Sequence, residues 1–316
     1  MSKKLTSVTF VTDCADVHAM ARVEKALVDL EIAEHIVPLP LHGELGAHAI
    51  EHMAALHAID QLSGGNYKTF FSQKEDTIKH TLLINAAPRT KKSQGKNGPP
   101  FCVFTLFNTC IISSYNEALL GFIADAGFDT DVYVFDRIKT PQGIVREFDY
   151  TDETVDFFTH TQFRSLEWLP RLVHILKKYD FNLTHPEMEK FYSSEFPVQS
   201  LSSYKSHLEL SRIFLIDCFG NIKTSISEKI IPPDRTSVTI DFIKNKELTD
   251  LQTLTLPVYK ALDEVPEGTL ALVRGSSGMY GNKLYELMVG KGNAVAECKK
   301  QGVDITFDTF LKVTSI

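Results

Sequence analysis

The sequence predicts an α/β protein with a mostly parallel N-terminal sheet flanked by helices, and a smaller, mainly antiparallel β domain at the C-terminus. Strand-like and helix-like segments alternate over the first 135 residues, as in βαβ units. After Ser206 the chain shows short β-rich segments separated by turns. Residues 179–203 are rich in Pro, Ser and aromatic residues without a sustained period, so we interpret them as a linker. The expected domains are therefore 1–195 and 205–316.

The N-terminal elements follow from apolar runs, which predict strands, and from apolar residues at helical spacing, which predict helices. The expected strands span 7–13, 35–41, 80–87, 101–108 and 131–136, and the expected helices span 16–31, 43–62, 115–127 and 152–178. Parallel sheets bind ligands beyond the carboxyl ends of their strands. Asp13, Asn85 and Asp136 fall at such ends.

The C-terminal elements are shorter and are bounded by turn residues. The expected strands span 212–226, 236–243, 253–262, 268–277 and 303–313, and one helix is expected at 282–289.

Composition limits the class of protein. The chain has 316 residues, enough for two domains, and its net charge of −7 argues against a nucleic-acid binder. No apolar run approaches the ~18 residues of a membrane span, and no secretory signal is evident. The five cysteines are odd in number and form no Cys-x-x-Cys pair. We therefore expect a soluble cytoplasmic protein with reduced thiols.

The stretch "HAIEH" fits a zinc-peptidase pattern, because histidines four residues apart share one helix face and a glutamate can activate water. In this interpretation His48 and His52 hold the metal and Glu51 is the base. The alternative is an ordinary amphipathic surface helix, to which the spacing of the alanines and isoleucines also points. Metal binding is the weaker of the two interpretations.

Two further segments can each be interpreted as part of a ligand site or as an ordinary surface turn or loop. "GSSGMYGNK" at 275–283 lacks the spacing of a phosphate-binding loop, but its backbone N–H groups and hydroxyls suit a carboxylate; an ordinary turn is equally consistent. "PRTKKSQGKNGPP" at 88–100 is either a solvated loop or a basic loop that closes over an anion. Asp13 either caps the helix that follows it or accepts hydrogen bonds from ribose hydroxyls.

The stretch "IDCFGN" at 216–221 ends an apolar strand with a carboxylate, an aromatic ring and an amide. Alternate residues of a strand project to one face, so Asp217, Phe219 and Asn221 are expected to form one wall of a ligand site. Gly220 between them permits close approach of backbone or ligand.

With "VPEGTLALVRGSSG" at 265–278 and "VGKGNAVAE" at 289–297, this stretch resembles the C-terminal domain of the S-adenosylmethionine hydroxide adenosyltransferases, or SAM hydrolases. Fainter similarity extends over the N-terminal half, where "TD" at 12–13, "LLINAAPRTKK" at 82–92, "SYNEALL" at 114–120 and "QFRSLEWLPRLVHIL" at 162–176 follow family motifs in outline.

The resemblance implies a role for individual residues. Asp217 would bind the methionine ammonium, Phe219 would line the adenine site and Asn221 would hydrogen-bond the adenine edge. The remaining expected substrate contacts are Asp13 to the ribose diol, Asn116, Ser276 or Ser277 to the methionine carboxylate, and Asn293 and Ala294 near the adenine amino group. The residues expected to handle the attacking water are Asn85, Lys92, His160 and Arg164.

The sequence departs from the family at the water-handling positions. Asn85 replaces an aspartate, Lys92 an arginine and Gln162 a histidine, although His160 lies two residues earlier and Arg164 is retained. Tyr115 replaces the aspartate that precedes Asn116. Residues that would bind the ligand are therefore better retained than those that would orient the water.

The resemblance implies hydrolysis of S-adenosylmethionine to adenosine and L-methionine by attack of water or hydroxide at the ribose C5′, with no cofactor. It also implies a homotrimer, with each site between the N-terminal domain of one subunit and the C-terminal domain of a neighbour. The alternative is a diverged protein that binds S-adenosylmethionine or adenosine without turnover. No nucleic-acid or membrane partner is expected.

Overall fold

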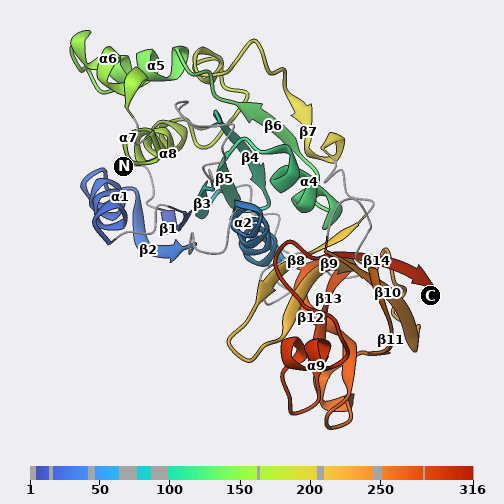
Figure 1. Cartoon of the computed structure of the whole chain (residues 1–316). Helices are drawn as coiled ribbons and strands as arrows, with labels where there is room; N and C mark the ends of the chain where they lie inside the picture. The colour runs from blue at the N-terminus through green and yellow to red at the C-terminus, as the bar shows by residue number, and fades with distance from the viewer. Residues whose placement is uncertain are drawn as a thin grey trace.

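The N-terminal half of the chain forms a seven-stranded sheet with helices on both faces (Figure 1). The structure is a computed structural model that describes residues 5–13, 17–41, 47–63, 77–86, 99–161, 164–204, 210–244, 251–279 and 282–315. The strands of the sheet are β1 Leu5–Thr12, β2 Ala33–Pro40, β3 His80–Asn85, β4 Phe101–Leu106, β5 Thr109–Ser114, β6 Asp131–Val134 and β7 Gln199–Ser200. Its helices are α1 Val17–Asp29, α2 Ala47–Ser63, α4 Glu117–Asp125, α5 Lys139–Glu147, α6 Glu153–His160, α7 Arg164–Glu167 and α8 Leu169–Lys178.

The sheet is mixed, which confirms the parallel expectation only in part. Its strand order is β2-β1-β3-β5-β4-β6-β7. Strands β2, β1, β3 and β5 are parallel to one another. Strand β4 pairs antiparallel with β5 and β6, and β7 is antiparallel to β6. Strand β5 was not predicted, because the turn that makes the β4–β5 hairpin lacks glycine. Phe107 takes the positive φ of 55° in that turn.

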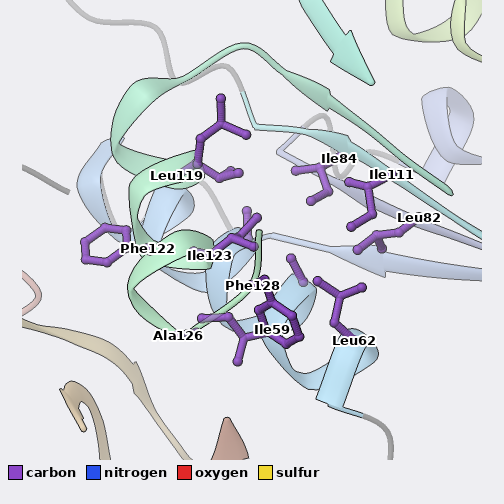
Figure 2. Close-up of a cluster of buried hydrophobic side chains, with 14 of the residues drawn as sticks. Ile59, Leu62, Leu82, Ile84, Ile111, Leu119, Phe122, Ile123, Ala126 and Phe128 are labelled. Carbon is purple, nitrogen blue, oxygen red and sulfur yellow. The ribbon is translucent and has the colours of Figure 1, made fainter. Parts of the chain in front are cut away.

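Two apolar cores lie on opposite faces of this sheet. One core combines α2 and α4 with one face of the strands (Figure 2). In Figure 2, Ile59 and Leu62 of α2 and Leu119 and Ile123 of α4 lie over strand residues such as Ile84. The other core packs α1, α5, α6 and α8 on the opposite face. Side chains at the carboxyl ends of the strands therefore lie between two helical layers.

The segment 179–203 is not a free linker, so that interpretation is wrong. Phe181, Met188 and Phe191 are buried in the second core. The segment contains the short 3-10 helices η3 Met188–Lys190 and η4 Leu201–Ser203 together with β7, which extends the sheet. Its aromatic residues are core residues, which explains their number.

The C-terminal half forms a closed barrel with the strand order β10-β11-β12-β13-β9-β8-β14. These strands are β8 Ser211–Ile216, β9 Ile222–Ser227, β10 Ser237–Ile243, β11 Leu251–Tyr259, β12 Leu270–Met279, β13 Asn282–Val289 and β14 Phe310–Ser315, accompanied by η5 Leu262–Glu264 and α9 Ala294–Lys300. All neighbouring strands pair antiparallel except β11 and β12, which are parallel. The expected antiparallel character therefore holds with one exception.

The helix predicted at 282–289 is wrong, because these residues form β13 between β12 and β9. Pairing on both sides overrides the helix propensity of Leu, Glu and Met. Lys283 and Glu286 are buried there, and Glu286 pairs with Lys223 of β9 at 2.8 Å. In the described part of this domain the α-helix is α9, which the sequence does not predict.

Helix α2 joins the two halves of the molecule by packing against β8 and β12. His52 Nδ1 lies 3.1 Å from the carbonyl oxygen of Ile213, and Asn282 Nδ2 donates to the Asp125 carbonyl of α4 at 3.1 Å. Helix α9 lies at the end of the barrel remote from the sheet (Figure 1). Among the described residues, no helix combines the length and the apolar character that a membrane crossing requires.

Candidate functional site

The stretch from Asp217 to Asn221 is a turn between β8 and β9, not a strand, so the expected strand alternation is wrong. Asp217 Oδ1 accepts hydrogen bonds from the N–H groups of Phe219 and Asn221, both at 2.9 Å. Its Oδ2 accepts from Asn221 Nδ2 at 3.0 Å. The carboxylate therefore fixes the turn and orients the amide, which leaves Asn221 Oδ1 directed away from the carboxylate as an acceptor.

Gly220 brings this turn against the start of α9. It has φ +83°, and a Cβ there would lie 2.1 Å from Asn293 Nδ2. Its carbonyl oxygen accepts from the N–H of Val295 at 3.3 Å. Asn293 caps α9 by accepting from Ala296 N–H at 2.8 Å, and Ala294 is fully buried. The "FGN" and "GNA" segments, distant in sequence, are therefore in contact.

Phe219 is the exposed member of this group. Its relative exposure is 72%, the second highest among the exposed large apolar residues of the described chain. The ring stands on a turn whose backbone is held on both sides by hydrogen bonds. A rigid turn with an exposed aromatic ring beside an amide acceptor suits a planar aromatic ligand that carries an amino group.

Ser276 and Ser277 do not lie with Asp217. They occupy an irregular part of β12, and two strands, β13 and β9, separate β12 from β8. Lys283 Nζ donates to the carbonyl oxygens of Ser276 and Gly278 at 2.6 and 2.9 Å, so these carbonyls bind the ammonium. Burial lowers the pKa of Lys283, an effect that Asp60 partly offsets. This segment is part of a strand, not a phosphate loop.

Asp13 and Asn85 meet at the carboxyl ends of β1 and β3. The Asp13 N–H donates to the Asn85 carbonyl oxygen at 3.2 Å, and Asn85 Nδ2 donates to Thr12 Oγ1 at 3.2 Å. Asn85 is buried and Asp13 is half-buried. Asp136, the third strand-end residue, accepts from the N–H groups of Ile138 and Lys139 at the start of α5. It therefore serves as a turn and helix-start residue.

Asn116 connects the sheet edge to α2. Its Oδ1 caps α4 by accepting from Leu119 N–H at 3.1 Å, and its Nδ2 donates to Glu51 Oε1 at 2.7 Å. Because the cap fixes the oxygen, the amide must present its nitrogen to Glu51. In the sequence Glu51 stands out only as part of "HAIEH", and its contact with Asn116 was missed because it depends on the tertiary packing of α2 on α4.

The zinc interpretation of "HAIEH" finds no support in this arrangement. His52 is buried with its ring edge-on to Phe122 and Phe214, and its Nδ1 faces the Ile213 carbonyl, whereas Glu51 faces Asn116. The side chain of His48 lies outside the described residues. Within the described part of the chain, no three His, Cys, Asp or Glu side chains are grouped as metal ligands would be.

Arg164 is buried at the same edge of the sheet, at the start of α7. Its Nη2 donates to the Pro99 carbonyl at 3.0 Å, and its guanidinium lies 5.8 and 5.4 Å from the ring centres of Phe101 and Trp168. Burial, with a smaller effect from Arg137, lowers the pKa of Arg164 to about 10, so the group remains cationic at neutral pH. A rigid cation therefore stands beside the start of β4, and Phe101 pairs with Ser114 of β5.

His160 is separate from this group. It is the last residue of α6, its side chain is 74% exposed, and its Nε2 lies 3.3 Å from Asp156 Oδ1. Lys92, Gln162 and the basic loop up to residue 98 lie outside the described residues. The structure thus gathers Asp13, Asn85, Asn116 and Arg164 at one edge of the sheet and leaves His160 on the surface.

Comparison with known proteins shows the fold alone. No protein-family model matches the chain, and no curated protein matches it. Two solved structures are similar over nearly their whole length. An uncharacterized conserved protein from Thermotoga maritima matches with a TM-score of 0.55 at 13% identity, covering 97% of this chain and 99% of that one. A conserved hypothetical protein from Thermus thermophilus matches with a TM-score of 0.50 at 14% identity, covering 98% and 100%. The joined sheet and barrel are thus a shared architecture.

Proposed function

We propose that the protein hydrolyses S-adenosylmethionine to adenosine and L-methionine by attack of water at the ribose C5′. The observation that carries the proposal is the contact between the Asp217–Asn221 turn and Asn293, which leaves Phe219 exposed. In the proposed complex the adenine stacks on Phe219, and its amino group donates to Asn221 Oδ1. Asp217 Oδ2 retains acceptor capacity for the methionine ammonium.

The sheet edge supplies the other half of the proposed site. Asp13 accepts from the ribose hydroxyls, Arg164 adds a fixed positive charge, and Asn85 and Asn116 offer neutral hydrogen-bonding groups to the water. The sulfonium is a good leaving group, so the site needs only to align the water with the C5′–S bond and exclude bulk solvent. The ammonium and the carboxylate of methionine are bonded to one carbon atom, so Asp217 and the distant Ser276 and Ser277 of one chain do not bind both groups of the same ligand.

The two halves of the proposed site lie apart within one chain, since α9 and the turn that contacts it are remote from the sheet (Figure 1). We propose that they meet between subunits of a homotrimer. Chains carrying Asp13→Ala can be mixed with chains carrying Phe219→Ala. Sites shared between chains would regain activity in mixed trimers, whereas sites within single chains would stay inactive in every mixture.

The direct test of the reaction is incubation of the purified protein with S-adenosylmethionine, followed by separation of the products. Hydrolysis gives adenosine and methionine in equal amounts.

A second candidate function is binding without turnover. Two observations favour it: Asn85 is a neutral amide that already donates to Thr12, and His160 is exposed. Tight binding of intact S-adenosylmethionine without adenosine would establish that candidate and refute hydrolysis.

A further inference from the structure

Hydrolysis at C5′ releases a proton, and the residues predicted to handle the water do not provide a group to accept it. Asn85 is a neutral amide, which cannot take a proton at neutral pH. His160 is the last residue of α6, and its side chain is 74% exposed and lies beside Asp156, so it is not held at the strand ends. A lysine side chain such as that of Lys92 is protonated at neutral pH and therefore cannot accept a proton. A different base is needed if the proposed function holds.

Glu51 is a carboxylate at this edge of the sheet. It is half-buried on α2 and accepts from Asn116 Nδ2 at 2.7 Å, at the start of α4. Because Asn116 is held by its cap on α4, the contact fixes the orientation of the Glu51 carboxylate.

The sheet register places Asn116, the partner of Glu51, near the end of the strand that carries Asn85. Strands β3 and β5 are parallel neighbours, and Ile84 pairs with Ser113. Asn85 and Ser114 are therefore adjacent strand ends, about 4.8 Å apart. Asn116 follows Ser114 by two residues, and the start of β4, which binds Arg164, pairs with Ser114. Asn116, which holds Glu51, thus lies at the same sheet edge as Asn85 and as the Pro99 and Phe101 contacts of Arg164.

We infer that Glu51 is the general base of the proposed hydrolysis and that Asn116 is the positioning residue that orients it. This inference rests on the proposed function. As the water oxygen forms its bond to C5′, the Glu51 carboxylate takes one of the water protons and the C5′–S bond breaks. Its electron pair stays on sulfur, so methionine leaves as a neutral thioether. Glu51 then releases the proton to solvent, which balances the reaction.

The test compares Glu51→Gln with Glu117→Gln, which removes a neighbouring exposed carboxylate from the first turn of α4. We expect Glu51→Gln to lower kcat by about 100-fold or more, with the Kd for S-adenosylmethionine unchanged within about threefold. Glu117→Gln should keep the wild-type kcat. Asn116→Asp keeps the helix cap but loses the amide donor, so it should lower kcat without unfolding α4.

Chemical rescue distinguishes a base from a structural residue. Glu51→Ala leaves room for a small carboxylate, so added formate should restore part of kcat, whereas formate should not rescue Glu51→Gln. An active wild type with an equally active Glu51→Gln variant would overturn the assignment while leaving hydrolysis intact. Loss of kcat at unchanged Kd in Asp13→Asn, but not in Glu51→Gln, would instead assign the base to Asp13. An inactive wild type would refute hydrolysis and the base together.

Discussion

The barrel and the sheet differ in how they hold the residues predicted for the site. In the barrel, one turn and one helix cap touch directly, so Asp217, Asn221 and Asn293 are fixed by local hydrogen bonds. At the sheet, each residue comes from the end of a different element, and their geometry depends on packing across α2, α4 and α7. In the proposed site, recognition of the ligand would therefore depend on a local motif, and the chemistry would depend on tertiary assembly.

The largest expected effect tests whether the turn and the cap act as one unit. Gly220 and Gly268 both have positive φ, at +83° and +73°, but a Cβ meets Asn293 only at Gly220 and nothing within 4 Å at Gly268. Gly268→Ala should cost about 1–2 kcal/mol of unfolding free energy from backbone strain alone. Gly220→Ala should cost about 1 kcal/mol more, because Asn293 must leave its cap.

Urea unfolding measures both costs, and titration with S-adenosylmethionine measures binding. Only Gly220→Ala should weaken binding, by about tenfold or more. Equal stability losses together with equal affinities in the two variants would show that the turn and the cap are independent.

The sequence predicted more of the local motif than of the assembled edge. The residues of the turn were singled out from "IDCFGN", although their backbone was expected to be a strand. Glu51 and Asn116 are 65 residues apart, and nothing in their spacing indicates contact. The helix expected at 282–289 failed for the same reason, since pairing with β12 and β9 on both sides decides that segment. Sequence periodicity indicates whether a segment locally prefers a helix or a strand, but it does not indicate which other element the segment packs against.

A second prediction separates binding from stability in the barrel. Phe219→Ala should leave the free energy of unfolding within about 0.5 kcal/mol, because the ring is exposed and covers little core. It should weaken binding of adenosine or S-adenosylmethionine by about 1–3 kcal/mol, the contribution of an aromatic ring stacked on a base. Calorimetric titration measures the affinity.

The control for this change is Phe157→Ala. It removes a ring that is 54% exposed from α6, a helix of the N-terminal half of the chain. It should bind the ligand as the wild type does. Unchanged affinity in Phe219→Ala would show that the exposed ring serves another purpose, such as contact with a second subunit alone.

A third prediction concerns the cap of α9. Asn293→Ala removes the acceptor for Ala296 N–H and should cost about 1 kcal/mol of unfolding free energy. Asn293→Asp keeps that acceptor and should be nearly neutral in stability. Thermal and urea unfolding compare the two variants. If Asn293→Asp lost as much as Asn293→Ala, the amide nitrogen, which faces Gly220, would matter more than the cap.

The smallest expected effect concerns pH and the helix that joins the two halves. Burial lowers the pKa of His57 on α2 below its ordinary value of 6.5, and Asp60 partly offsets this effect. The unfolded chain therefore binds the proton more readily, so unfolding free energy should fall as pH drops below about 6.5 and continue to fall down to the folded pKa. His57→Gln should remove this part of the pH dependence; at pH 8, where the histidine is neutral in both states, any difference between the two proteins reflects packing. Urea unfolding of both proteins between about pH 5 and pH 8 measures the difference. A variant whose stability falls with acid as steeply as the wild type would show that other groups set the acid response of this helix.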